Sequence, residues 1–300
     1  MAKEIVFVHG LGRKPPLDLY VPRLKRYLEE SVGRGIAAEN FHVAYWTEAI
    51  EPGRQPLTAE EDEYKESGDG SVNFRAYTFR EEWSFRARGI AKGVVTRELE
   101  DRISRILQPG DGDDPEDIIS QVRDVVASFI TNEVAGAVYE TFVRDVDLYF
   151  RQGRRDPVKQ VVQDALSALP ADSQVCLIGH SMGSFVSLDV ILEGTRHIDR
   201  LITIGSPLGI SVVQAEIGLT DENRAGLKEN VTDWFNLYDR LDCVAIDSDL
   251  EDDFPEIQPI DRPIQNEFIE KEEGKRNHHK SYGYLRSPEL GEVVADFLDD

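Results

Sequence analysis

Short apolar runs alternate along the chain with segments whose apolar residues recur at helical spacing. The apolar runs end in turn or polar residues and predict β-strands over residues 5–8, 41–46, 175–178, 201–204, 234–238 and 267–269. Several runs are continuously apolar, which is typical of strands that are buried on both faces of a sheet. The helical patterns between them predict helices over residues 20–30, 157–169, 184–192 and 288–298. This alternation indicates an α/β fold with a doubly wound, mostly parallel sheet.

The stretch of residues 50–155 departs from this alternation because it contains no strand signal. Residues 51–73 are polar and rich in Gly, Pro and Glu, which predicts a loop. Amphipathic helices are then predicted around residues 83–107, 118–130 and 134–146. We therefore divide the chain into a core of residues 1–49 and 156–300 and a helical insertion of residues 50–155. The insertion either packs its apolar faces on the core or forms a lid over an active site.

Composition excludes some classes of partner. Of the 300 residues, 40% are hydrophobic and 30% are charged, so the chain can bury a sizeable core. Its 34 basic and 57 acidic residues give a net charge of -23, which repels phosphate backbones and anionic lipid headgroups. No apolar segment has the length of a membrane span or of a signal peptide's apolar region. We expect a soluble, cytoplasmic protein that does not bind nucleic acid or insert into membranes.

No metal site or cofactor site is predicted. The 2 cysteines cannot form a disulfide framework or a four-cysteine zinc site. The acidic runs at residues 111–117 and 247–253 lack the spacing and the terminal Glu of a calcium-binding loop, so we interpret them as solvated loops.

The most informative motif is Gly179-His180-Ser181-Met182-Gly183, which follows an apolar strand and precedes a helix. G-x-S-x-G in this strand–turn–helix context is typical of a nucleophilic serine. The chain turns from strand to helix within a couple of residues, which forces the serine into a strained backbone conformation. Side chains two positions before and after the serine would collide at this turn, and glycines at both positions remove the collision. We expect Ser181 to be a nucleophile, with the Met182 amide directed to the same place; the alternative is a structural turn with an incidental serine.

A second motif, His9-Gly10-Leu11-Gly12, follows the first predicted strand. An oxyanion hole needs a second backbone amide from a loop beside the nucleophile, and small residues let that loop approach closely. We expect Leu11 to supply this amide, and we interpret His9 as a structural residue of the turn. A dinucleotide-binding loop also begins with Gly-x-Gly, but here Pro15 stands where its third glycine would be.

A nucleophilic serine needs a base within hydrogen-bond reach and a carboxylate that orients the base. His278 and His279 lie in a polar loop between the last predicted strand and the last predicted helix. The order Ser, acid, His places the acid between Ser181 and these histidines, at the carboxyl end of a strand. Asp239 and Asp242 both follow a predicted strand there, so the residues alone leave two acids and two bases open.

These features together resemble the α/β-hydrolase superfamily, and in particular its lipase-like and serine-esterase members. The matching pieces are His-Gly at residues 9–10, GHSMG at 179–183, GSPLG at 205–209, Asp-Cys-Val at 242–244 and His-x-x-Tyr at 279–282. The resemblance implies a catalytic triad of Ser181, His279 and Asp242, with His278 and Asp239 in reserve.

The resemblance also implies a function: a carboxylic ester hydrolase that works through an acyl-enzyme and needs no cofactor. The apolar stripes of the insertion favour a small-molecule ester with an apolar acyl group. An acyltransferase, an amidase or a thioesterase on the same scaffold is an alternative, as is a non-catalytic module that binds a protein partner through the insertion. Two features depart from the family. The chain begins at the His-Gly strand, so we expect only about six strands, and the insertion precedes the nucleophile elbow.

Overall fold

The computed structural model describes residues 1–58, 133–242, 244–245, 249–266, 268 and 277–300. Most of the predicted insertion lies outside these residues, including the predicted helices around 83–107 and 118–130. The acidic run at 111–117, part of the run at 247–253 and Cys243 lie outside them as well.

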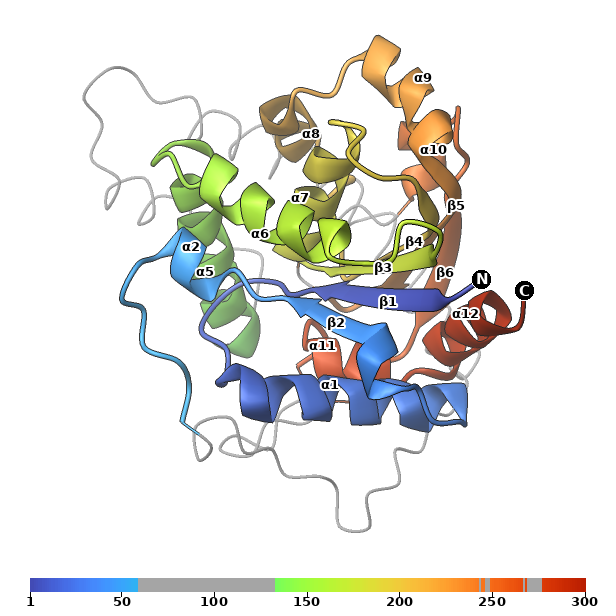
Figure 1. The fold of residues 1–300 in the computed structure, drawn as a ribbon. Helices are drawn as coiled ribbons and strands as arrows, with labels where there is room; N and C mark the ends of the chain where they lie inside the picture. The colour runs from blue at the N-terminus through green and yellow to red at the C-terminus, as the bar shows by residue number, and fades with distance from the viewer. Residues whose placement is uncertain (59–132, 243, 246–248, 267, 269–276) are drawn as a thin grey trace, which may run out of the picture.

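A six-stranded sheet forms the centre of the fold (Figure 1). Its strand order is β2-β1-β3-β4-β5-β6, and every pair of neighbours is parallel. The strands are β1 (Lys3–Val8), β2 (Phe41–Ala44), β3 (Gln174–His180), β4 (Ile198–Ile204), β5 (Val231–Asp239) and β6 (Ile260–Ile264). The prediction of a doubly wound α/β fold with a parallel sheet of this size is confirmed.

The sixth strand is not where the sequence predicted it. The apolar run at 267–269 was expected to form it, but Phe268 lies in no strand, and residues 267 and 269 lie outside the described residues. Instead β6 pairs with β5 through Ile260 to Ile264. This strand is at the edge of the sheet and most of its side chains are at least partly exposed, so its sequence is not apolar. An edge strand also tolerates the missing amide hydrogen of Pro263.

Helices cover both faces of the sheet (Figure 1). One layer consists of α1 (Leu17–Val32), α11 (Ser281–Leu285) and α12 (Pro288–Asp299). The opposite layer contains α2 (Thr47–Ile50), α5 (Glu133–Phe150), α6 (Arg155–Ser167), α7 (Met182–Ile191), α8 (Ser211–Ile217), α9 (Asp221–Asn230) and α10 (Leu250–Asp253). A short 3-10 helix, η1 (Ala38–Asn40), leads into β2. In the part of the chain that is described, no helix is both long and apolar enough to cross a bilayer.

The last helix shows how local sequence sets its bounds. The hydroxyl of Ser287 accepts the backbone N–H of Leu290, and Pro288 occupies the first helical position, where its missing N–H costs nothing. Apolar residues then recur at helical spacing and are buried against the sheet: Leu290, Val293, Val294 and Phe297. The helix predicted over 288–298 therefore forms with nearly the expected bounds.

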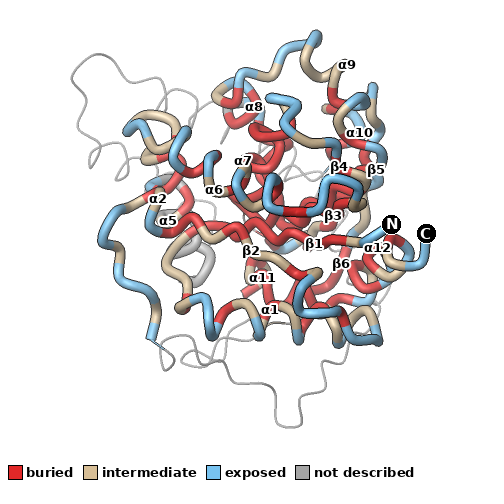
Figure 2. Tube along the Cα trace, in the orientation of Figure 1, coloured by how far each residue is buried: buried red, intermediate tan, exposed pale blue. Residues whose placement is uncertain are grey.

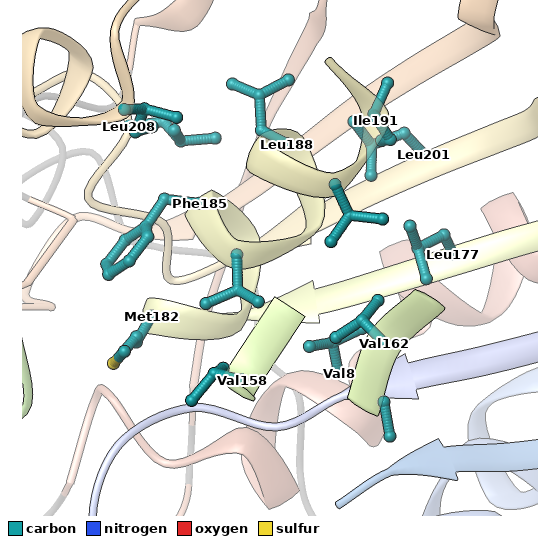
Figure 3. Close-up of a cluster of buried hydrophobic side chains, with 14 of the residues drawn as sticks. Val8, Val158, Val162, Leu177, Met182, Phe185, Leu188, Ile191, Leu201 and Leu208 are labelled. Atoms are coloured by element: carbon teal, nitrogen blue, oxygen red, sulfur yellow. The ribbon is translucent and has the colours of Figure 1, made fainter. Parts of the chain in front are cut away.

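Each central strand contributes to two hydrophobic cores, because its successive side chains point to opposite faces. On β3, Val175 and Leu177 belong to the core under α6 and α7, whereas Cys176 and Ile178 belong to the core beside α1 and α12. Figure 3 shows the first of these cores, and Figure 2 shows that buried residues are concentrated along the strands. Burial on both faces explains why the strand sequences are continuously apolar.

Helix α5 corresponds to the third helix that was predicted in the insertion. Of the apolar positions on its predicted stripe, Phe142 and Val146 are buried in the core that also contains α6 and α7. This part of the predicted insertion therefore packs on the core. The lid interpretation concerns residues outside the described ranges, and the division of the chain at residues 50 and 155 stays a prediction.

The connections of β1 and β3 create a switch point in the sheet. From β1 the chain runs outward to β2, and it later returns to β3 on the other side of β1. In doubly wound sheets, ligands bind at the carboxyl ends of two such strands. Val8, the last residue of β1, pairs with Gly179 near the end of β3. The loop after β1 and the turn after β3 therefore leave the sheet at the same point.

Candidate active site

Ser181 lies at the turn between β3 and α7 and has a strained backbone conformation. Its φ is 54° and its ψ is -125°. Residues other than glycine rarely adopt such a conformation, which costs about 1–3 kcal/mol. Hydrogen bonds on both sides hold the turn: Ser181 N–H donates to the Ile204 carbonyl (3.0 Å), and the Ser181 carbonyl accepts the N–H of Ser184 (2.9 Å). The strain expected from the motif is present.

Close contacts explain both glycines of the motif. A Cβ atom on Gly179 would lie 2.7 Å from the Cα of Ser184, so this glycine lets the strand pass beside the following helix. A Cβ atom on Gly183 would lie 2.2 Å from the carbonyl oxygen of Val8. Gly183 therefore lets α7 approach β1, which is a contact between elements that the motif itself did not indicate.

The side chains of Ser181, His279 and Asp242 form one hydrogen-bonded chain. His279 Nε2 lies 2.8 Å from Ser181 Oγ, and His279 Nδ1 lies 2.9 Å from each carboxylate oxygen of Asp242. The three residues come from the turn after β3, the segment after β5 and the loop before α11. In this geometry the carboxylate fixes the imidazole tautomer, so that Nε2 can accept the serine proton.

The environment of Asp242 favours its charged form. Burial, the largest single cause, would raise the pKa of this carboxyl group, but the interactions with His279 and the hydrogen bonds described next together outweigh it. The backbone N–H of Val244 and the hydroxyl of Tyr284, each 2.8 Å from a carboxylate oxygen, lower the pKa further. The net effect holds the pKa below its ordinary value of 3.8, so the carboxylate facing His279 is ionised at neutral pH.

The reserve residues form a second pair, and among the described residues no hydrogen bond joins their side chains to the serine hydroxyl. His278 Nδ1 lies 3.1 Å from Asp239 Oδ2. The Asp239 carboxylate also accepts the backbone N–H groups of Leu241 and Asn266, both at 2.7 Å. Among the hydrogen bonds of the described residues, the one to Ser181 Oγ comes from His279, not from His278. The structure thus brings together the preferred acid and base.

Polar side chains hold the backbone of the loop that carries His279. The ring of His180 donates from Nε2 to the His279 carbonyl (2.8 Å) and lies 4.9 Å from the His279 ring. Burial lowers the pKa of His180 well below its ordinary value, so this ring is neutral. Asn266 Nδ2 donates to the carbonyls of His278 and Lys280, both at 2.9 Å. An asparagine in a polar segment follows no recognisable pattern, so Asn266 could not be identified from the sequence.

Tyr284 contacts the acid of the hydrogen-bonded chain. Its hydroxyl donates to Asp242 Oδ2 (2.8 Å) and accepts the backbone N–H of Asp239 (2.9 Å). Burial and the charge of Asp242 raise the pKa of Tyr284 well above its ordinary value, so the hydroxyl keeps its proton. The tyrosine in the terminal sequence pattern is Tyr282, whose ring instead packs 5.2 Å from Tyr27 of α1. The residue that supports the acid thus lies two positions beyond the pattern.

The loop after β1 lies directly beside the serine. A Cβ atom on Gly10 would lie 2.7 Å from Ser181 Cβ and 2.7 Å from His180 Nδ1. Only a glycine permits this approach, which places the backbone of Leu11 next to the turn. Leu11 and Met182, the residues expected to supply oxyanion-binding amides, are both buried there. Their role as oxyanion donors stays a prediction.

His9 is a structural residue of this loop. It is fully buried, its Nδ1 donates to the carbonyl of Gly10 (2.8 Å), and its Nε2 accepts the backbone N–H of Trp46 (3.1 Å). Burial lowers its pKa well below the ordinary value, so the ring is neutral. With both nitrogens used by the backbone, His9 has no atom left to act as a base, in agreement with the sequence interpretation.

Within the described ranges, no group of three or more His, Cys, Asp or Glu side chains is arranged to hold a metal ion. Cys176 is buried on β3, and burial raises the pKa of its thiol to about 12. It therefore packs as a small apolar residue.

Comparison with family models matches residues 147–239 to the "PGAP1-like alpha/beta domain", an α/β-hydrolase family. The matched segment contains Ser181 and ends before Asp242 and His279. Searches of curated proteins and of solved structures found no significant match. The family match and the parallel six-stranded sheet together confirm the resemblance to α/β-hydrolases.

Proposed function

We propose that this α/β-hydrolase domain is a serine hydrolase that cleaves carboxylic esters through an acyl-enzyme. The observation that carries the proposal is the hydrogen-bonded chain from Ser181 Oγ through His279 to Asp242. It lies at the switch point of the sheet, where ligands of doubly wound folds bind. The family match supports a hydrolase but does not specify the ester or the triad.

The geometry suits a two-step reaction. Ser181 Oγ attacks the acyl carbon while His279 Nε2 takes its proton, and the imidazolium that forms is stabilised by Asp242. His279 then protonates the departing alcohol. In the second step His279 deprotonates water, which attacks the acyl-enzyme, and the proton returns to Ser181 as the acid leaves. The Asp242 carboxylate stays ionised throughout, consistent with the direction of its pKa shift.

Stabilisation of the oxyanion is assigned to backbone amides. Met182 begins α7, so its N–H is one of the helix's first amides, which have no partner within the helix. Leu11 follows Gly10, whose backbone approaches Ser181 closely. Two such amides would stabilise the negative charge that develops on the acyl oxygen.

Burial of the site strengthens these interactions. The exposed fractions of Ser181, Asp242 and His279 are 0%, 2% and 7%. Electrostatic interactions are stronger where water is excluded, so the ion pair that forms during proton transfer gains more here than on a surface. An apolar acyl ester is the substrate class proposed, because such a group enters a buried site without a large desolvation cost.

The first test is labelling with a fluorophosphonate probe, read by intact mass, on wild type and on Ser181→Ala. We expect one adduct on wild type and none on the variant. The probe requires only an activated serine and an oxyanion site, so it makes no assumption about the substrate. No adduct on folded wild type would contradict the proposal and favour the binding-module alternative.

A second test addresses the substrate class. A series of p-nitrophenyl esters of increasing acyl length should give higher kcat/KM for longer, more apolar acyl groups. Amide and thioester analogues, and an added alcohol or amine acceptor, should be turned over more slowly. If they are preferred, the protein is an amidase, a thioesterase or an acyltransferase on the same scaffold.

A further inference from the structure

Helix α5, which belongs to the predicted insertion, contacts the loop beside Ser181. The Asp145 carboxylate accepts the backbone N–H of Gly12 at 2.8 Å. Asp145 is fully buried. Gly12 has a φ of +77°, and a Cβ atom there would lie 3.4 Å from Cγ2 of Thr141, one turn earlier on α5. The loop therefore packs directly on this helix.

The charge of Asp145 is balanced inside the protein. Arg54 donates from both terminal guanidinium nitrogens, at 3.4 and 3.3 Å, and its side chain is only 7% exposed. Arg54 also pairs with Glu51 at 3.2 Å. Asp145 and Arg54 thus form an ion pair, and a charged acceptor binds a backbone N–H more strongly than a neutral one.

These contacts fix the orientation of one peptide group. The Leu11 carbonyl and the Gly12 N–H belong to the same planar peptide. Lys14 Nζ donates to the Leu11 carbonyl, and Asp145 accepts from Gly12. Both polar groups of this peptide are therefore held, and the peptide cannot rotate without losing two charge-assisted hydrogen bonds.

The preceding peptide group, Gly10–Leu11, is held through its carbonyl. His9 Nδ1 donates to the Gly10 carbonyl. In a trans peptide the carbonyl and the following N–H point in opposite directions, so the Leu11 N–H points away from His9. The two peptide groups share the Leu11 Cα, so the contacts that Asp145 and Lys14 make with the second limit how far the first, which carries the Leu11 N–H, can shift.

We propose that Asp145 is a positioning residue for the oxyanion site: it holds the Leu11–Gly12 peptide and thereby directs the Leu11 N–H toward the reacting acyl oxygen. This inference rests on the proposed serine hydrolase function. It makes α5 part of the machinery of the site rather than only a packing element.

Two double variants of the full-length protein differ only in the acceptor for Gly12 N–H. Arg54→Met with Asp145→Asn removes both charges and keeps a side-chain oxygen at position 145. Arg54→Met with Asp145→Leu removes the acceptor as well. Replacing both members of a buried ion pair by uncharged residues often leaves a protein folded, whereas removing one member leaves an unpaired charge.

For both variants we measure three properties: the rate of labelling with a fluorophosphonate, kcat and KM for a p-nitrophenyl ester, and the melting temperature. The loss of a single oxyanion donor costs about 100- to 1000-fold in kcat, so we expect misdirection of one to cost about 10-fold or more. The leucine variant should therefore have a kcat about 10-fold or more below the asparagine variant, with KM within about threefold. Equal kcat values would overturn the inference.

A matched control lies on the central strands β3 and β4, at the end of the sheet opposite Ser181. Asp199 accepts the backbone N–H of Val175 at 2.8 Å, near the amino ends of the strands. Asp199→Asn and Asp199→Leu should differ in melting temperature but not in kcat. If this pair shows the same kcat difference, general destabilisation explains the result and the inference is wrong.

Wild type and Ser181→Ala are labelled in the same series. If wild type is not labelled, the proposed function fails and the inference fails with it. If wild type is labelled at Ser181 but the two double variants react equally, the inference alone fails.

Discussion

Around His279, single residues control how closely the acid and the base approach each other. Gly205 follows β4, with a φ of +55°, and its N–H donates to the Leu237 carbonyl. A Cβ atom on Gly205 would lie 2.8 Å from Asp242 Oδ2 and 3.3 Å from His279 Nδ1. Gly205 therefore leaves the space in which the imidazole and the carboxylate meet.

We predict that Gly205→Ala lowers both stability and activity, whereas Gly218→Ala lowers only stability. Gly218 also has a positive φ, +83°, but a Cβ atom there would meet nothing within 4 Å in the part of the chain that is described. Both substitutions place an L-residue in the left-handed region, at a cost of about 1–2 kcal/mol. Only the first displaces Asp242, and small displacements of a reacting group can cost about 100-fold in rate.

The measurement for this pair is kcat on an ester together with urea unfolding. Similar losses of unfolding free energy with very different kcat values would support the steric role of Gly205. If Gly218→Ala loses as much activity as Gly205→Ala, the contact with Asp242 and His279 is not what matters.

At the scale of secondary-structure elements, one polar cluster joins the helices on the side of α7; its Tyr149 and Asp189 are buried, and the Arg155 side chain is 33% exposed. Arg155 of α6 donates to both carboxylate oxygens of Asp189 on α7, each at 2.8 Å. Tyr149 of α5 donates to the same carboxylate at 2.6 Å, and Arg155 also donates to the Ile217 carbonyl at the end of α8. A single guanidinium and a single carboxylate thus connect four helices.

We predict that Arg155→Met lowers the free energy of unfolding by about 3 kcal/mol, because the buried Asp189 carboxylate loses its charged partner and keeps, of its described partners, only the hydroxyl of Tyr149. Arg34 provides the control, since it pairs with Asp299 in a salt bridge whose side chains are 43% and 67% exposed. Arg34→Met should cost less than about 1 kcal/mol. Urea unfolding measures both, and equal costs would contradict the importance of the polar cluster.

At the scale of the whole molecule, two buried histidines make stability depend on pH. Burial lowers the pKa of His9 and of His180 well below 6.5. Below pH 6.5 the unfolded chain binds protons at these residues that the folded chain does not bind. Folding stability is therefore complete above pH 6.5 and decreases as pH falls, by about 1.4 kcal/mol per pH unit for each histidine.

Urea unfolding between about pH 7 and about pH 5 tests this dependence. We expect the unfolding free energy to fall with pH in wild type and to fall less steeply in His9→Gln. Asp242 adds a separate, more acidic effect: its lowered pKa contributes stability above pH 3.8 that is lost as pH falls further. An unfolding free energy independent of pH between about pH 6.5 and about pH 5 would contradict the neutral state of the two histidines.

Most of the sheet is predictable from the sequence because burial on both faces requires continuous apolar runs. β1, β3, β4 and β5 have neighbours on both sides, and each was located by such a run. β6 has a neighbour on one side only and contains Arg262 and Pro263, so it has no such signature. β2 also has one neighbour only, yet its apolar run at 41–46 located it, so an edge strand can carry this signature but does not need it.

The turn at Ser181 can be read from local sequence alone, since strand, turn and helix are adjacent in the chain and the steric need for glycine acts over a few residues. The sequence also narrowed the acid to Asp239 or Asp242 and the base to His278 or His279. Only the tertiary structure joined His279 and Asp242 to Ser181, and only it brought Tyr284, Asn266 and Asp145 to the site. These contacts span many residues of chain. Their partners are set by how the helices pack on the sheet, and no local pattern encodes that packing.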